Sequence, residues 1–315
     1  MSKCLFCYQV LDNDQLDYHP SCIKKLFGTT QAPIIDFDLN QLEELAKQIV
    51  IQSKAITGVQ PKLSLNVEKH KNEPSRLTIV GFHGDYILKP PTSQFRELPE
   101  NEDVTMHLAE SVKMKTAKHG LIRLKSGELA YITKRFDRNK GDKVAVEDFC
   151  QLSENLTEHK YRGSIEKIGK LVYAFTQNKG FEAQRLFELV LFSYLTGNAD
   201  MHLKNFSLIE NSLGEYELSP AYDLLNTAIV IPEDKEESAL TINGKKSKLN
   251  RKDFQVLATS LKISDKSLEA IYKRFEAILP TWLSWIDQSF LTLELKDDYK
   301  HLITKRSKKL FCISP

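Results

Sequence analysis

The stretch Gly197-Asn-Ala-Asp-Met-His-Leu-Lys-Asn-Phe-Ser207 carries the most information in this sequence. Within a few residues it contains four different polar side chains, Asp200, His202, Lys204 and Asn205. The preceding segment, Phe181 to Leu195, has helical periodicity and ends at Gly197-Asn198, a typical helix stop. We therefore expect these polar groups in a loop on a rigid support, where functional residues are concentrated.

A predicted hairpin follows this loop and returns the chain towards it. Its strands are Phe206 to Ile209 and Tyr216 to Leu218, and Asp223 comes just after them. Asp223 can therefore approach Asp200 and Asn205. Phosphoryl transfer needs such a set, because one carboxylate orients a hydroxyl while an amide and a second carboxylate hold Mg²⁺ on the phosphates. Asp200 or His202 alone could simply cap a helix. Capping explains the full set, which includes Asp223, less well.

Two upstream segments have the character of a nucleotide site. Tyr86-Ile-Leu-Lys89-Pro90 puts a lysine at the end of an apolar strand, where it is costly unless it faces an anion such as ATP phosphate. Glu102, on the next predicted helix, can pair with Lys89, although a lysine in this position is more often a surface residue. The turn Thr57-Gly58-Val59-Gln60 has backbone N–H groups that can hold phosphates, but its single glycine is a weak signal.

Three of the five cysteines crowd the N-terminus in the pattern Cys4-x-x-Cys7…His19-x-x-Cys22. Without an export signal, a disulfide framework is not the first expectation. Such short pairs can present soft donors to one tetrahedral ion, most often Zn²⁺. The alternative, small buried hydrophobic residues with a chance histidine, stays open at this point.

The composition is that of an ordinary globular protein. The 315 residues include 44 Lys+Arg and 42 Asp+Glu, a net charge of +2, which argues against coating nucleic acid or an anionic membrane. The first residues lack the apolar core of a signal peptide, and no apolar stretch is long enough to span a bilayer. We therefore expect a cytoplasmic protein with no direct nucleic-acid or membrane partner.

The order of the predicted elements indicates an α+β fold. A helix starting at Asn40 is followed by short strands and one helix from about Glu100 to Ser111. Beyond Glu147 the pattern is mainly helical, with Ile165 to Phe175 and Lys252 to Leu310 as examples. The sequence predicts three parts: a cysteine-bearing knuckle at 1–30, a β-rich lobe at 36–145 and a helical lobe at 146–315.

The chain carries seven motifs in this order: Ile56-Thr-Gly-Val-Gln-Pro-Lys62, Tyr86-Ile-Leu-Lys-Pro90, Pro99-Glu-Asn-Glu102, Lys134-Arg-Phe-Asp-Arg138, Val146-Glu-Asp-Phe-Cys-Gln151, Gly197 to Ser207 and Pro220-Ala-Tyr-Asp223. Together they resemble the HipA family of bacterial toxin kinases, from about Ile51 to the C-terminus. The resemblance implies a two-lobed protein-kinase-like fold, ATP with Mg²⁺, and aminoacyl-tRNA synthetases as targets of serine/threonine phosphorylation.

The resemblance also implies residue roles. Asp200 would be the catalytic aspartate, Asn205 and Asp223 the metal ligands, and Lys89 the phosphate-holding lysine. The hinge would accept adenine and ribose through Lys134, Phe136 and Asp137, with His202 and Lys204 at the phosphate end. Thr57, or less favourably Ser53, would be phosphorylated by the enzyme itself and would leave the site, because phosphothreonine carries roughly −1.5 to −2 charges.

This chain departs from long family members, which carry about a hundred more residues before the phosphate loop. It therefore resembles the short HipT-like toxin of three-component systems, with a small HipS-like protein and a HipB-like DNA-binding antitoxin as expected partners. Thr57 stands where serine is common, and Lys134 where the long toxin is acidic. The sequence predicts a protein kinase toxin that inhibits translation; the alternatives are a catalytically silent binding module and a small-molecule kinase.

Overall fold

The computed structural model describes residues 2–12, 17–45, 62–68, 75–80, 84–139 and 142–311. The chain divides into two units. The first unit comprises Met1–Asp103, Ala117–Gly141 and Gln288–Phe290, and the second comprises Val104–Thr116, Asp142–Asp287 and Leu291–Pro315. The division falls inside one helix, α3, which spans Leu98–Ser111.

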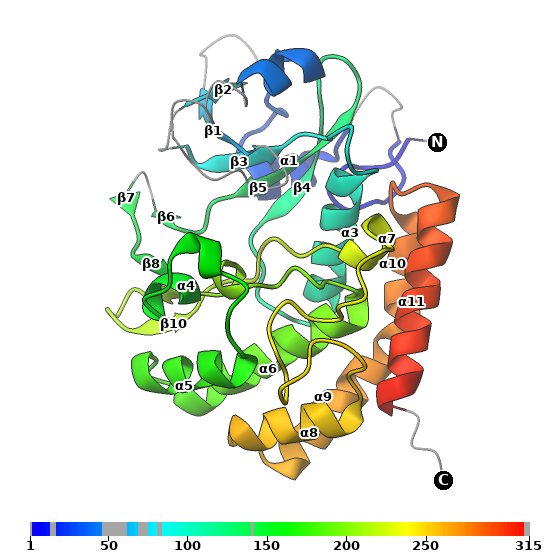
Figure 1. Cartoon of the computed structure of the whole chain (residues 1–315). Helices are drawn as coiled ribbons and strands as arrows, with labels where there is room; N and C mark the ends of the chain where they lie inside the picture. Colours follow the sequence, from blue (N-terminus) through cyan, green and yellow to red (C-terminus); the bar gives the residue numbers. More distant parts are fainter. Residues whose placement is uncertain are drawn as a thin grey trace. The chain divides into compact units, whose positions relative to one another are not determined.

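The first unit is built on an antiparallel sheet in the order β2-β1-β3-β5-β4 (Figure 1). Its strands are β1 (Leu63–Glu68), β2 (Arg76–Ile79), β3 (Tyr86–Lys89), β4 (His119–Arg123) and β5 (Leu129–Lys134). Leu88 at the centre of the sheet is opposite Leu63 on one side and Ile132 on the other, and all three side chains are fully buried. The sheet places Lys89 at the end of β3, opposite Tyr131.

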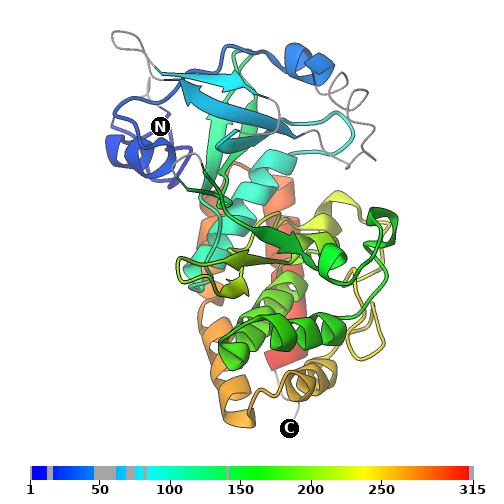
Figure 2. The ribbon, with the colours of Figure 1, turned by 90° about the vertical axis from the view of Figure 1, so that its left-hand side faces the viewer.

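The strand β4 was not predicted from the sequence. The N-terminal residues pack against it. The β4 run His-Gly-Leu-Ile-Arg has no polar–apolar alternation, because all but Arg123 are buried. The Leu121 N–H donates to the Leu5 carbonyl at 3.0 Å. A Cβ on Gly120 would lie 2.9 Å from Leu26 of α1 (Pro20–Phe27), so glycine permits this close approach. Figure 2 shows this N-terminal segment, in dark blue, beside the sheet.

The helix predicted from Asn40 is present, but its cap differs. Residues 39–45 are helical. The Asp38 carboxylate accepts from the Gln41 N–H at 2.9 Å, and the Gln41 side chain accepts from the Asp38 N–H at 3.0 Å. Asp38, not Asn40, is therefore the capping side chain, because a reciprocal pair satisfies two backbone donors at once. Ala46 and Ile49, which the sequence placed on this helix, lie outside the described residues.

The second unit contains a small antiparallel sheet in the order β10-β9-β8, with β8 at Val146–Asp148, β9 at Ser207–Glu210 and β10 at Tyr216–Leu218. The predicted hairpin is confirmed, with β10 at the expected residues. β8 was not predicted, since three residues are too few for a periodic signal. β8 pairs with β9 so that Asp148 is opposite Ser207.

Helices make up most of the second unit. They are α4 (Phe149–Leu152), α5 (Ile165–Phe175), α6 (Lys179–Thr196), α7 (Thr227–Val230), α8 (Arg251–Ser260), α9 (Asp265–Ala277), α10 (Leu279–Gln288) and α11 (Leu293–Phe311). The predicted helix at Ile165–Phe175 and the mainly helical region after Lys252 are confirmed. Short 3₁₀ turns lie at Thr157–His159 (η1) and Leu203–Asn205 (η2), and two-residue strands at Arg138–Asn139 (β6) and Asp142–Lys143 (β7).

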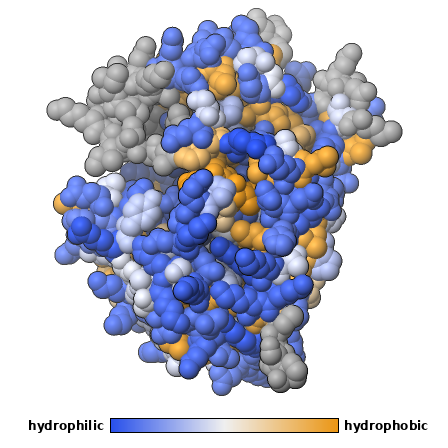
Figure 3. All heavy atoms as spheres, turned by 45° about the vertical axis from the view of Figure 1, so that its right-hand side comes forward, coloured by the Kyte–Doolittle hydropathy of each residue, from blue (hydrophilic) through white to orange (hydrophobic). Residues whose placement is uncertain are grey.

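The fold is therefore α+β, with a smaller β-rich unit and a larger helical one, as predicted. Hydrophilic residues dominate the face shown in Figure 3. Within the part of the chain that the structure describes, no helix combines the length and apolar character needed to cross a membrane.

Candidate active site

The candidate catalytic loop begins where α6 ends. Gly197 has φ 83°, and its N–H returns to the carbonyls of Ser193 and Tyr194. A Cβ at this position would lie 2.4 Å from the Asn226 side-chain oxygen. Both the left-handed backbone and the tight contact require glycine here, so the helix stops at a fixed point and the following residues form a loop.

Asp200 is oriented by a side chain from another segment. The Tyr161 hydroxyl donates to Asp200 Oδ1 at 2.6 Å, and the Asp200 N–H donates to the Asn198 side-chain oxygen at 3.1 Å. Burial raises the pKa of Tyr161, and the neighbouring Asp200 carboxylate raises it further. Tyr161 is therefore a protonated donor that directs one carboxylate oxygen of Asp200.

Asn205 is held inside the loop by its own side chain. It is 5% exposed, and its Nδ2 donates to the Asp200 backbone carbonyl at 3.1 Å. Because the amide nitrogen makes this bond, Oδ1 is the atom that can meet a cation. Asp200 and Asn205 are thus joined within one turn.

Asp223 is attached to the same loop through its neighbour Tyr222. The Tyr222 hydroxyl donates to the Lys204 carbonyl at 2.8 Å and is hydrogen-bonded to the Ser207 hydroxyl at 2.6 Å. Asp223 itself has φ 58°, a left-handed conformation that an aspartate tolerates better than most residues. The structure therefore brings the backbone that carries Asp223 to the loop of Asn205.

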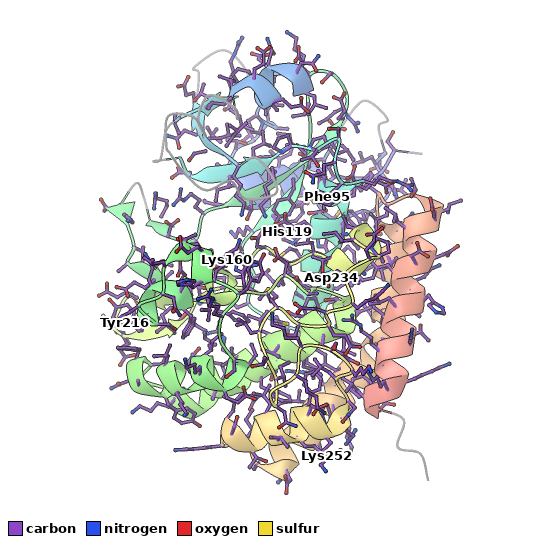
Figure 4. All side chains as sticks on the ribbon, in the orientation of Figure 1. Phe95, His119, Lys160, Tyr216, Asp234 and Lys252 are labelled. Carbon is purple, nitrogen blue, oxygen red and sulfur yellow. The ribbon has the colours of Figure 1, made fainter. Side chains whose placement is uncertain are left out.

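His202 is a buried imidazole of the same loop, and its ring meets the Tyr161 ring edge to face at 5.1 Å. Burial lowers its pKa, the charges of Asp200 and Asp223 oppose this shift, and Lys160 adds to it. Both carboxylates thus act on one ring, which supports their grouping in space. Lys160 is labelled in Figure 4, and its ammonium lies 5.1 Å from the centre of the Tyr161 ring.

Lys204 is engaged with a carboxylate from β8. Its Nζ lies 3.0 Å from Asp148 Oδ2, and the lysine side chain is 36% exposed. Asp148 is also the N-cap of α4 in a capping box with Gln151. A phosphate contact of Lys204 would therefore compete with a partly exposed ion pair, a weak interaction of about 0–1 kcal/mol.

The first unit contains the predicted lysine–glutamate pair. Lys89 Nζ lies 2.5 Å from Glu102 Oε1, and both side chains are at most 5% exposed. The lysine ammonium also lies 5.3 Å from the centre of the Tyr131 ring. Glu102 thus holds a buried cation at the end of β3, as the sequence predicted.

The predicted hinge segment follows β5, and two of its backbone N–H groups are already bonded. The Lys134 N–H donates to the Lys118 carbonyl at 2.7 Å, and the Arg135 N–H donates to the Asp85 carbonyl at 2.8 Å. Adenine could receive neither hydrogen without breaking one of these bonds. Phe136 follows directly and is half-buried.

Asp137 is bound by two arginines. Arg135 donates to both carboxylate oxygens, at 2.9 and 2.7 Å, and Arg138 donates to Oδ2 at 2.7 Å. Burial alone would raise the pKa of Asp137, but the Arg135 bonds and the charge of Arg138 hold it below its ordinary value. The phosphate-loop residues Thr57, Gly58, Val59 and Gln60 lie outside the described residues, as does Ser53.

The four N-terminal candidate ligands also converge. The ligand atoms of Cys4, Cys7, His19 and Cys22 all lie within 4.8 Å of one another. Within the described residues these three cysteines form no disulfide, and Cys4 and Cys22 are buried.

Sequence reasoning assigned no role to three side chains that contact the loop, namely Tyr161, Tyr222 and Asp148. Tyr222 adjoins Asp223 and could have been noticed from that position. Tyr161 lies in a segment without regular periodicity, and no local pattern links it to Asp200.

Comparison with known proteins identifies relatives of this chain. A model of the HipA-like C-terminal domain matches residues 54–282. A putative kinase, Y4dM of Sinorhizobium fredii (strain NBRC 101917 / NGR234), is 32% identical over 244 residues, which are 71% of this chain and 58% of that protein. The serine/threonine-protein kinase toxin HipA of Shewanella oneidensis is 28% identical over 192 residues, 55% of this chain and 43% of that protein. The chain thus spans about half the length of these curated relatives.

The fold is also similar to that of a solved structure. The Shewanella oneidensis MR-1 HipA chain, in a complex with HipB and operator DNA, superposes with a TM-score of 0.67 at 21% identity, covering 84% of this chain and 70% of that one. This likeness concerns the fold alone. The match of the family model over residues 54–282 shows that this chain belongs to the family of the HipA-like C-terminal domain.

Proposed function

We propose that this protein is an ATP- and Mg²⁺-dependent protein kinase that phosphorylates serine or threonine. The observation that carries the proposal is the joining of Asp200, Asn205 and the Asp223 segment around one loop. Oxygen donors from a carboxylate and an amide are the ligands that Mg²⁺ prefers, so the donor set fits this cation. Mg²⁺ on the ATP phosphates would neutralise the charge that develops during transfer.

Asp200 would orient the attacking hydroxyl through the oxygen that Tyr161 does not contact. Asn205 and Asp223 would hold the metal, and neutral His202 would line the loop. In the first unit, Lys89 would hold the ATP phosphates, while Glu102 fixes the lysine. The phosphate loop Thr57–Gln60, Lys204 and the Lys134–Asp137 segment would complete nucleotide binding. Positioning and electrostatics would supply the catalysis, since phosphoryl transfer needs little covalent work from the protein.

We further propose a toxin role, with a cytosolic enzyme such as an aminoacyl-tRNA synthetase as the substrate. The support is family membership and the relative named as a serine/threonine-protein kinase toxin. A HipB-like antitoxin is the corresponding partner, because HipB accompanies HipA in the similar structure; a small HipS-like protein would be a second. Failure of the neighbouring gene products to co-purify with this chain would contradict both partners.

Asp200→Asn and Asp223→Asn test the kinase assignment. Each variant should lower γ-phosphate transfer by at least about a hundredfold, because each removes a group used in the transition state. Asp200→Asn should still bind Mg·ATP, whereas Asp223→Asn should lose much of that binding. Transfer of radiolabelled phosphate to a synthetase mixture and calorimetric titration with Mg·ATP measure the two effects.

Asp298→Asn is the matched control, since it removes the same charge from an exposed position on α11. It should keep wild-type transfer. Equal activity in all four proteins would contradict the kinase assignment, and ATP binding without any transfer in the wild type would favour a silent module.

A further inference from the structure

The N-terminal cysteines lie on a tight turn that the backbone closes. The Tyr8 N–H donates to the Cys4 carbonyl at 3.0 Å, and the Cys4 N–H donates to the Gln9 carbonyl at 2.9 Å. Tyr8 has φ 62°, so the chain reverses directly after Cys7. The second pair, His19 and Cys22, lies at the start of α1. Two separate elements thus deliver two ligands each to one place.

The distances between the ligand atoms fit one tetrahedral ion. Cys7 Sγ and Cys22 Sγ lie 3.5 and 3.9 Å from His19 Nδ1, and all four ligand atoms are within 4.8 Å of one another. A metal–sulfur distance of about 2.3 Å gives tetrahedral edges of about 3.8 Å. Only small movements would therefore close the shell.

The His19 ring is held in the orientation that a metal ligand needs. Its Nε2 lies 3.1 Å from the Val10 carbonyl oxygen. Because a carbonyl only accepts, Nε2 carries the hydrogen, and the lone pair of Nδ1 points to the cysteines. A bond from the second ring nitrogen to a backbone carbonyl is the usual support of a metal-bound histidine. A histidine buried by chance would not need its Nδ1 lone pair to be directed at cysteines in this way.

The same turn is connected to α3. The hydroxyl of Tyr8, the residue after Cys7, donates to Asp103 Oδ2 at 2.6 Å, and Asp103 Oδ1 lies 2.6 Å from His119 Nδ1. His119 is labelled in Figure 4. All three side chains are at most 1% exposed. Asp103 directly follows Glu102, which pairs with Lys89.

We infer that Cys4, Cys7, His19 and Cys22 bind one Zn²⁺ ion, and that this ion anchors the first turns of α3 through Tyr8 and Asp103. Three thiolates and one imidazole are the donor set of structural zinc, whereas Mg²⁺ and Ca²⁺ require oxygen ligands. Four protein ligands leave no position for a substrate, so the ion is structural. It fixes the turn that carries Tyr8, and the buried hydrogen bond transmits this constraint to the helix of Glu102.

Metal analysis of protein purified without chelator tests the site. We expect one zinc per chain in the wild type and in Cys150→Ser, a control that removes a buried thiol elsewhere. The double variant Cys4→Ser/Cys7→Ser should hold none. His19→Cys should retain zinc because it preserves four soft ligands, while His19→Ala should bind it at least about tenfold more weakly in competition with a chelating dye. If the double cysteine variant does not fold, the contrast between His19→Cys and His19→Ala still tests the zinc site.

Hydrogen exchange tests the connection to α3. Tyr8→Phe should keep zinc, yet amides in the first turns of α3 should exchange about tenfold faster than in the wild type. Chelation should have the same effect or a larger one, while α5 of the second unit stays unchanged as an internal control. Unaltered α3 exchange in both experiments would overturn the anchoring role. Absence of stoichiometric zinc, or cysteines recovered as disulfides, would overturn the site. Neither readout depends on kinase activity.

Discussion

At the scale of single residues, Asp200 shows how the loop depends on distant side chains. Its backbone is fixed locally by Asn198 and Asn205, whereas its carboxylate is directed by Tyr161. The sequence identified Asp200, Asn205 and Asp223 as candidates, because polar types at short spacing are visible in one dimension. Tyr161 could not be identified in this way, because its role exists only once the fold has brought two segments together.

Tyr161→Phe should lower kcat of phosphate transfer about threefold to tenfold with little change in the KM for ATP. The substitution removes one hydrogen bond from Asp200 and leaves the ring in place, so the carboxylate loses orientation while its charge remains. Steady-state kinetics at saturating substrate measure this. Tyr216→Phe on the partly exposed β10 strand is the control and should behave as wild type. A raised KM with unchanged kcat would instead place Tyr161 in ATP binding.

At the scale of elements, strongly periodic segments were predictable, whereas the continuously buried strand β4 was not. The helix α5 and the strand β10 have the predicted bounds, since their apolar spacing follows the period of a helix or a strand. In contrast, β4 escaped notice because successive side chains along it are buried, and its backbone hydrogen-bonds to β5 and to the Leu5 carbonyl. Its burial depends on Leu5 and Leu26, which no local pattern connects to it.

The first turn of α3 contains a titrating group that links stability to pH. Burial raises the pKa of Glu100 from 4.5 to about 7, and the charges of Glu97 and Asp103 add to this shift. Between these two pH values the folded chain binds a proton that the unfolded chain has lost. The free energy of unfolding therefore falls as pH rises from about 4.5 to 7.

Glu100→Gln should remove this pH dependence, because the amide stays neutral in both states. At pH 8 the variant should be more stable than wild type by roughly 3 kcal/mol, and near pH 4 the difference should vanish. Urea unfolding at both pH values provides the comparison. Glu128→Gln, which changes an exposed carboxylate of the same unit, should shift stability by a few tenths of a kcal/mol at most. A variant no more stable than wild type at pH 8 would contradict the raised pKa.

At the scale of the whole molecule, the division into two units could be predicted only in part from the sequence. The β-rich and helical parts follow from pattern, and the separate knuckle at 1–30 stays a prediction. The sequence could not show that Gln288–Phe290 belongs to the first unit. Lys3 Nζ donates to the Gln288 carbonyl at 2.6 Å, and the Phe290 ring meets the Tyr8 ring edge to face at 5.2 Å. Contacts between residues so far apart in the chain produce no periodic pattern in the sequence.

The two units should contribute different properties to the proposed reaction, and a paired substitution can separate them. Replacing Lys89 alone would leave the Glu102 carboxylate buried without its cation, which typically lowers the free energy of unfolding by about 3–5 kcal/mol. Weaker ATP binding by such a variant could then result from unfolding. Lys89→Met/Glu102→Leu replaces both charges by apolar groups of similar volume, which is often neutral for stability.

We expect the double variant to bind Mg·ATP at least about tenfold more weakly than wild type, because it lacks the cation for the phosphates. Asp200→Asn, in the second unit, should keep wild-type affinity and lose turnover. Calorimetric titration of both variants, alongside their thermal unfolding curves, distinguishes the effects. Unchanged ATP affinity in a folded Lys89→Met/Glu102→Leu protein would remove Lys89 from nucleotide binding, and the buried pair would then serve only to hold α3 against the sheet.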